Sequence, residues 1–190
     1  MAANRILVLF GHPAVRKSRV NRRMAEAAAS IPGVTLRDLY ELYPDFVIDV
    51  DVEKKQLLAH DIIVFQHPFY WYSTPAIFKE WFDLVLEYGF AYGPGGTALH
   101  GKSWLTAITA GGQKQSYCSE GHNAFSIREL LAPMEQTATL CGMQFLEPHV
   151  TYGVHQLDSK TEIPAAVEAY VRRIESLKTL QSTPEVSRAR

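Results

Sequence analysis

Three consecutive aromatic residues, Tyr70 to Tyr72, lie in a short segment between Pro68 and Pro75. The segment follows an apolar run over residues 61–66, whose length and β-branched content are typical of a buried strand. Proline ends such a strand and is also favoured where a helix begins, so we expect a rigid strand-to-helix loop. In open α/β sheets, ligands bind outside the carboxyl ends of the strands. The aromatics therefore suggest a flat ligand, although core or subunit-contact roles are the structural alternative.

A second loop with chemical potential, residues 11–21, follows the first apolar run of the chain. It contains His12, several basic residues and Ser18, and this serine can cap the helix that comes next. Unpaired N–H groups at a helix start bind phosphate, and nearby hydroxyl, amide and basic groups strengthen such a site. The alternative is that Ser18 is only a cap and His12 only a surface histidine.

A third loop begins with Gly111 and Gly112, directly after an apolar run over residues 102–110. Paired glycines let a ligand approach the backbone closely, whereas the alternative is an ordinary flexible loop. Tyr117 and His122 follow, and both can hold or share a proton. Together the three loops would supply a phosphate cradle, an aromatic wall and a polar backbone edge. Flavin mononucleotide (FMN) requires those three features.

The remaining pattern supplies the elements that must position these loops. Apolar runs predict strands at 5–10, 34–40, 61–66, 102–110 and 144–152, and helices at 21–31, 52–60, 75–87, 127–140 and 163–180. This alternation predicts an α/β three-layer sandwich around a five-stranded parallel sheet. We expect the flavodoxin-like strand order 2-1-3-4-5, because the first turn lacks GxGxxG and GxxxxGK[ST]. One domain is expected over residues 1–180, and a flexible tail over 181–190.

The bulk composition excludes several classes of protein. With 190 residues and a formal net charge of −1, the chain can bury one core and has no general basic character for binding nucleic acid. Cys118 and Cys141 form no CxxC motif and no metal-ligand spacing, so neither a disulfide framework nor a metal site is expected. We find neither a signal peptide nor a membrane span in the sequence, and expect a cytoplasmic protein.

Other chemically suggestive residues receive structural interpretations. Gly93 to Gly96 is interpreted as a flexible turn, and the acids Asp49 and Asp51 as the start of a helix. The remaining histidines are interpreted as structural or solvated: His60, His67, His100, His149 and His155.

Taken together, the motifs resemble a known family. Gly11-His12-Pro13 with Ser18-x-x-Asn21, His67-Pro68-x-x-Trp71-Tyr72-x-x-Pro75-Ala76 and Thr109-x-Gly111-Gly112 resemble the flavodoxin-like NAD(P)H:quinone oxidoreductases. Leu39-Tyr40-x-x-Tyr43-Pro44-Asp45-Phe46 and Gly93-x-Gly95-Gly96 make the chain similar to the small bacterial flavoproteins that accompany glutathione-gated potassium-efflux antiporters. The resemblance extends from about Ile6 to Tyr152.

The resemblance implies a cofactor, a reaction and an assembly. FMN is expected rather than FAD, because the longer family members add C-terminal chain that this protein largely lacks. NAD(P)H would reduce FMN, and a quinone would then take two electrons in the same place, which predicts ping-pong kinetics. The resemblance also implies a homodimer with two active sites at the subunit interface.

Two other functions stay open. The protein could be a regulatory ancillary subunit that docks on a potassium-efflux antiporter at the inner face of the membrane, with oxidoreductase activity secondary. It could also be a one-electron carrier, but an electron shuttle is expected to use a strongly charged docking face, which the near-neutral net charge does not indicate.

The resemblance also assigns roles to individual residues. Tyr117 and His122 would be catalytic, beside the ring where charge develops during hydride and proton transfer. Relatives often have glutamine at the position of Tyr70 and a second threonine at that of Ala110, and longer members have one more residue between Tyr117 and His122. The implied cofactor-binding residues are His12, Ser18, Arg19, Val20, Asn21, Pro68, Phe69, Tyr70, Trp71, Tyr72, Thr109, Ala110, Gly111 and Gly112.

Overall fold

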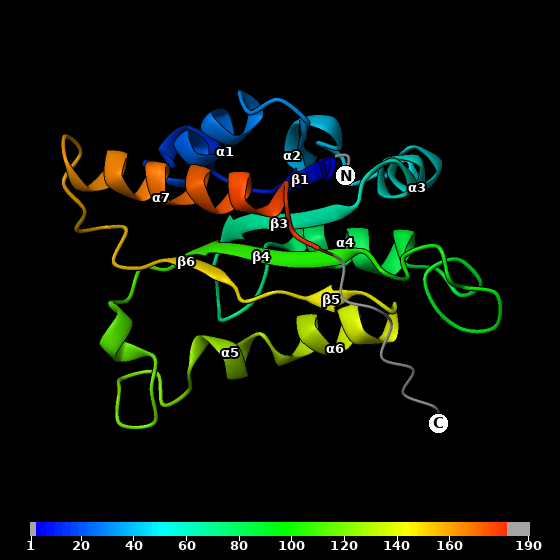
Figure 1. Cartoon of the computed structure of the whole chain (residues 1–190). Coiled ribbons are helices and arrows are strands. Elements are labelled where there is room, and N and C mark those ends of the chain that lie inside the picture. The colour runs from blue at the N-terminus through cyan, green and yellow to red at the C-terminus, as the bar shows by residue number, and fades with distance from the viewer. Residues whose placement is uncertain (1–2, 182–190) are drawn as a thin grey trace.

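Parallel pairing of apolar strands builds the central sheet of this protein (Figure 1). The computed structural model describes residues 3–181. Its strands are β1 (Ile6–Phe10), β2 (Val34–Asp38), β3 (Ile62–Pro68), β4 (Ser103–Thr109), β5 (Gln144–Phe145) and β6 (His149–Thr151). Their order is β2-β1-β3-β4-β5, and β6 also pairs with β4. The predicted fold class and strand order are confirmed, whereas most of the predicted tail, 182–190, lies outside the described residues.

Helices cover both faces of this sheet because the strands alternate between two apolar clusters. On one face, Val8, Val64 and Leu105 pack with α1 (Asn21–Ala29) and α7 (Glu162–Leu177). On the other, Phe65 and Trp104 stack, with ring centroids 4.0 Å apart. That second face is covered by α2 (Leu39–Leu42), α3 (Val50–Ala59), α4 (Ala76–Val85), α5 (Ile127–Leu130) and α6 (Ala132–Leu140).

Three predicted boundaries are wrong for local reasons. The strand predicted over 34–40 ends at Asp38, because that carboxylate accepts from the N–H groups of Tyr40 and Glu41 and starts α2. The last predicted strand divides into β5 and β6 around Pro148, which has no N–H to donate to a ladder. The helix predicted over 127–140 is interrupted at Leu131, just before the proline in the first turn of α6.

A buried carboxylate joins β2, α3 and α4. Glu53 is fully buried and accepts from Trp81 Nε1 at 2.9 Å, Arg37 Nε at 3.0 Å and the hydroxyl of Tyr43 at 2.7 Å. Burial and the neighbouring Glu53 raise the pKa of Tyr43 to about 12, so that its hydroxyl stays protonated as the donor. None of these four residues lines a described cavity, and their mutual contacts give the group a structural role.

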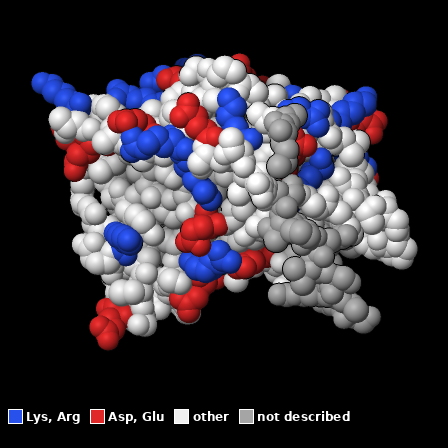
Figure 2. Space-filling view, in the orientation of Figure 1, with Lys and Arg blue, Asp and Glu red and all other residues white. Residues whose placement is uncertain are grey.

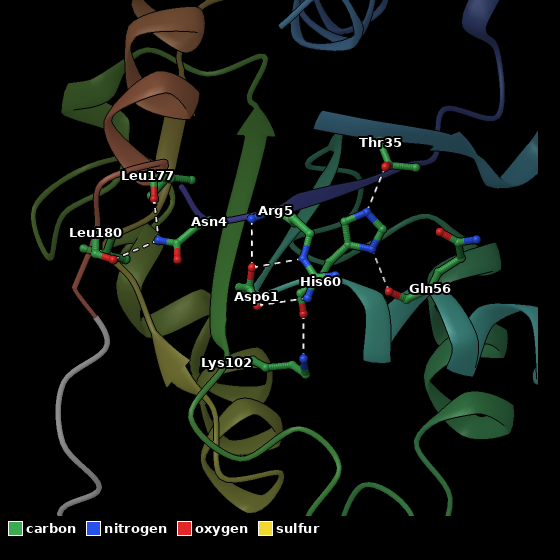
Figure 3. Close-up of polar contacts among 9 residues, drawn as sticks. All are labelled: Asn4, Arg5, Thr35, Gln56, His60, Asp61, Lys102, Leu177 and Leu180. Atoms are coloured by element: carbon green, nitrogen blue, oxygen red, sulfur yellow. Dashed lines mark hydrogen bonds and ion pairs between the residues drawn. The ribbon is translucent and has the colours of Figure 1, made fainter. Parts of the chain in front are cut away.

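Polar contacts also close the edge at the amino ends of the strands (Figure 3). The Arg5 N–H donates to Asp61 at 2.8 Å, and Lys102 Nζ donates to the His60 carbonyl at 2.6 Å. The His60 ring lies 2.8 Å from Thr35 Oγ1 and 2.7 Å from the Gln56 carbonyl, which confirms its structural interpretation. The three loops that the sequence predicts to bind a ligand lie at the opposite edge of the sheet, at the carboxyl ends of the strands.

The molecular surface gives no sign of a single-sign docking face in the view of Figure 2, where acidic and basic side chains are intermixed. Among the described residues, ion pairs join such side chains, for example Arg128 with Glu135 and Arg22 with Glu26 at 2.8 Å. Within residues 3–181, no helix has both the length and the apolar character needed to cross a membrane.

Candidate functional site

A cavity of about 810 Å³ opens at the carboxyl edge of the sheet, a size within the range of small-molecule sites. Parallel pairing of β1, β3 and β4 brings the three predicted loops to this edge, as topology requires. The lining residues are His12, Ala14, Lys17, Ser18, Arg19, Val20, Asn21, Pro68, Phe69, Tyr70, Trp71, Tyr72, Thr109, Gly111, Gly112, Ser116, Tyr117, His122, Asn123, Val154 and His155.

The structure therefore brings together every predicted site residue except one. Ala110 is fully buried and does not line the cavity. Its N–H donates to the Thr151 carbonyl at 2.8 Å, so this amide already belongs to the sheet and is not available to a ligand. The predicted set is therefore corrected by removing Ala110 as a direct contact of the cofactor.

A fourth loop, after β6, contributes Val154 and His155, which sequence reasoning missed. Arg19 brings this loop to the cavity, because its guanidinium donates to the carbonyls of Leu157 at 2.8 Å and His155 at 3.4 Å. No local motif marks the loop. The only available signal was topological, since it follows a strand of the same parallel sheet. Ser116 and Asn123, within the third loop, were also not singled out, nor was Ala14 in the first, and Lys17 was noted only as one of several basic residues.

The aromatic loop is a tight turn with an unusual backbone. The Ser73 N–H donates to the Tyr70 carbonyl at 3.0 Å, and the two central residues, Trp71 and Tyr72, have φ values of 52° and 60°. Left-handed backbone costs a non-glycine residue roughly 1–2 kcal/mol. The turn holds Trp71 91% exposed at the cavity, while Tyr72 donates to Asn123 Oδ1 at 3.1 Å and joins the second loop to the third.

The structure gives a reason for glycine at positions 111 and 112 that differs from the predicted one. A Cβ atom at Gly111 would lie 3.0 Å from the His155 ring, and one at Gly112 would lie 3.2 Å from the Tyr117 ring. The missing side chains thus make room for two protein side chains as well as leaving backbone on the cavity. Tyr117 in turn packs against Phe69 and Tyr152, so the glycine pair fixes one wall of the site.

The end of the cavity beside α1 is rich in hydrogen-bond donors. His12 Nδ1 accepts the Ala14 N–H at 3.1 Å, so a neutral imidazole must hold its proton on Nε2. Burial lowers the pKa of His12, which favours this neutral form. The Ser18 hydroxyl accepts the Arg22 N–H at 3.1 Å and so satisfies one N–H group in the first turn of α1, although the N-cap residue itself is Val20. Across the described chain, the N–H groups of Arg19 and Val20 have no acceptor.

The charge of the cavity favours an anionic ligand. Lys17 and Arg19 contribute to the lining, and none of the described lining residues is Asp or Glu. Burial raises the pKa of Tyr117, so its hydroxyl stays protonated at neutral pH, whereas His122 is exposed to solvent. A phosphate fits the donor-rich end, and an extended aromatic ring fits the end lined by residues 69–72.

Comparison with known proteins agrees with this geometry. The model of a family described as having a flavodoxin-like fold matches residues 4–174. The chain belongs to this family. It is 46% identical over 172 residues to the "Uncharacterized NAD(P)H oxidoreductase YdeQ" of Bacillus subtilis, covering 90% of this chain and 87% of that protein. It is also 46% identical over 153 residues to the glutathione-regulated potassium-efflux system ancillary protein KefG of Pectobacterium atrosepticum, covering 80% and 84%.

Solved structures extend the comparison. General stress protein 14 from Treponema denticola, solved in complex with FMN, superposes with a TM-score of 0.86 at 31% identity, covering 91% of this chain and 99% of that one. An NADPH-quinone reductase from P. pentosaceus superposes with a TM-score of 0.81 at 26% identity, covering 90% and 97%. The family resemblance drawn from the sequence motifs is confirmed.

The strained turn generates a stability prediction. Glycine adopts positive φ without a Cβ penalty. The free energy of unfolding of Trp71→Gly should therefore exceed that of Trp71→Ala by about 1 kcal/mol, and its urea midpoint should be higher. Both variants lose the same exposed ring, and urea unfolding of the cofactor-free proteins isolates the backbone difference. At an unstrained exposed position, glycine is the less stable of the two. An alanine variant as stable as the glycine variant would show that residue 71 is not strained.

Proposed function

We propose that this protein is an FMN-dependent NAD(P)H:quinone oxidoreductase. The observation that carries the proposal is a single cavity with a donor-rich, acid-free end beside α1 and an aromatic end at residues 69–72. The named activities of similar proteins, an NAD(P)H oxidoreductase and an NADPH-quinone reductase, support it. The FMN complex of a similar protein supports the choice of cofactor.

The residues of the cavity fit FMN at both ends. The N–H groups of Arg19 and Val20, the side chain of Lys17 and Nε2 of His12 would bind the phosphate. The aromatic loop would line the ring, and Thr109, Gly111 and Gly112 would meet its polar edge. When bound, FMN supplies the hydride chemistry, while the protein supplies orientation and electrostatics.

The exposed side of the aromatic loop would receive the two substrates in turn. NAD(P)H would bind first and a quinone second. The nicotinamide ring and the quinone ring are both flat, and both can stack on Trp71 and Tyr72. Tyr117, whose pKa is raised by burial, would donate a hydrogen bond where negative charge develops. His122 is exposed at the cavity and would pass a proton between the substrate and solvent.

The direct test is an absorbance spectrum of the purified protein loaded with FMN. We expect a flavin spectrum that bleaches when NADH or NADPH is added without oxygen and returns when a quinone follows. Because one cavity serves both substrates, steady-state rates should give parallel double-reciprocal lines. A protein that cannot take up FMN would refute the function, and intersecting lines would refute the shared cavity.

The catalytic residues have a separate prediction. The double variant Tyr117→Phe with His122→Ala should slow flavin reduction by NAD(P)H at least about tenfold, the scale of a lost positioned proton donor. Its affinity for FMN should change less than the reduction rate, since neither side chain belongs to the donor-rich end. Stopped-flow reduction measures the rate, and Cys118→Ser, an exposed change in the same loop, is the matched control. An unchanged rate would remove both residues from the mechanism.

We propose further that the protein forms a homodimer. Large apolar side chains are strongly exposed, including Trp71 at 91%, Val47 at 72% and Tyr88 at 66%, and exposed apolar surface supports a protein contact. Sedimentation should give twice the chain mass of 21.4 kDa. A monomer at micromolar concentration would contradict the dimer without affecting the assignment of the cofactor.

Similarity to KefG favours a second function, that of a cytoplasmic ancillary protein docked on a potassium-efflux antiporter at the inner face of the membrane. Binding to the cytosolic regulatory domain of an antiporter encoded beside this protein would support the role. If that binding occurs and quinone turnover is absent, regulation is the main function. If turnover occurs without binding, the protein acts as an enzyme alone.

A further inference from the structure

A chain of buried hydrogen bonds runs from α7 to the cavity. The Tyr170 hydroxyl lies 2.9 Å from Gln66 Oε1, and Gln66 Nε2 lies 2.8 Å from the Asn21 carbonyl oxygen. The Asn21 side-chain amide nitrogen then lies 2.6 Å from Thr109 Oγ1. Tyr170 and Gln66 are 0% exposed and Asn21 is 1% exposed, so water cannot replace these partners. The chain joins α7, β3, α1 and β4, and only its two cavity-side members, Asn21 and Thr109, line the site.

The direction of the first bonds follows from chemistry. A backbone carbonyl can only accept, so the Gln66 atom that faces the Asn21 carbonyl must be the amide NH2 group. The Gln66 oxygen therefore faces Tyr170, and Tyr170 must donate. Burial raises the pKa of Tyr170 far above its usual range, which keeps that proton in place.

The same reasoning fixes the end of the chain. The second proton of the Gln66 amide faces Asn21 Oδ1 at 3.3 Å, so the NH2 group of Asn21 faces Thr109. The Thr109 hydroxyl consequently accepts from Asn21, and its own proton is not used within the chain of bonds. Thr109 lines the cavity, so this proton is free for a ligand acceptor.

We infer that Tyr170 and Gln66 are positioning residues that set Thr109 as a hydrogen-bond donor to the polar edge of the bound flavin. The inference rests on the proposed function and adds two buried residues that do not touch the cavity. Without the Tyr170 hydroxyl, Gln66 Oε1 has no donor among the described residues, and only the bonds to Asn21 still hold the amide. A less firmly held Gln66 orients the Asn21 side chain less strictly, so Thr109 can donate to Asn21 Oδ1 rather than to the ligand.

A double-mutant cycle on FMN affinity tests the inference. Tyr170→Phe and Thr109→Val should each weaken FMN binding about five- to tenfold, the scale of one lost net hydrogen bond. If both changes remove the same bond, the FMN affinity of the double variant should be at most about twofold lower than that of whichever single variant binds FMN less tightly. Multiplied effects, of about 25- to 100-fold, would show that Tyr170 does not act through Thr109 and would overturn the inference.

Three matched variants separate positioning from general stability. Thr109→Ser keeps the hydroxyl, so it should weaken FMN binding less than Thr109→Val does and should stay sensitive to Tyr170→Phe. Tyr43→Phe also removes a buried tyrosine hydroxyl, one that donates to Glu53, and should lower the urea midpoint without changing FMN affinity. Equal weakening of FMN binding by Tyr43→Phe would mean that Tyr170 acts through stability alone. If Tyr170→Phe does not fold, Gln66→Leu takes its place in the cycle with the same expected coupling.

A spectroscopic measurement gives an independent result. The visible absorption band of bound FMN should shift by the same amount and in the same direction in Tyr170→Phe and Thr109→Val, because both remove one donor from the ring. A shift in Thr109→Val alone would overturn the inference. An unaltered protein that does not bind FMN would refute the proposed function itself. Tight FMN binding with multiplied effects in the cycle would refute only the positioning role.

Discussion

The hydrogen bonds of Asn21 are the constraint on which the site depends. Asn21 is the first residue of α1, and it contacts Gln66 in β3 and Thr109 at the end of β4. A single buried residue thus fixes the start of α1 relative to both strands that lead into the aromatic and glycine loops. Buried polar groups tolerate few alternative arrangements, because any unpaired member costs about 1–3 kcal/mol. The loops that line the cavity are therefore held in one arrangement relative to α1.

Further backbone contacts extend this rigidity around the cavity. The Phe69 N–H donates to the Thr109 carbonyl at 2.8 Å, and the Gly153 N–H donates to the Gly112 carbonyl at 3.0 Å. Each bond joins neighbouring loops across the edge of the sheet. The site is thus built by loops that are pinned to one another, which is how a scaffold keeps binding groups in place before a ligand arrives.

The same region also holds the least favourable local structure. Trp71 and Tyr72 occupy left-handed backbone, and His67 is fully buried with no partner for Nε2 among the described residues. Burial lowers the pKa of His67 to about 4, so the ring stays neutral beside Phe78. Such features persist only where the surrounding structure enforces them, and they gather at binding sites. Strain in the aromatic turn is consistent with a surface shaped for a ligand rather than for stability alone.

The sequence was sufficient to predict the sheet order, the three loops and most of the cavity lining, because strand periodicity and parallel topology determine which loops meet. Residues distant in sequence escaped prediction where tertiary contacts decide their place. His155 was interpreted as structural or solvated, but in the structure Arg19 holds its loop at the cavity. Ala110 was predicted to contact a ligand, but in the structure its N–H donates to the Thr151 carbonyl. The reason for Gly112 became visible only with the Tyr117 ring in place.

We propose that a donor-rich helix start and an aromatic loop together select a flavin that carries a phosphate. Calorimetric titration of the cofactor-free protein with FMN and with riboflavin tests it most directly, because the two ligands share the ring and differ in the phosphate. Hydrogen bonds to charged groups contribute about 1.5–3 kcal/mol each, so FMN should bind at least about 100-fold more tightly than riboflavin. Equal affinities for the two ligands would contradict the account.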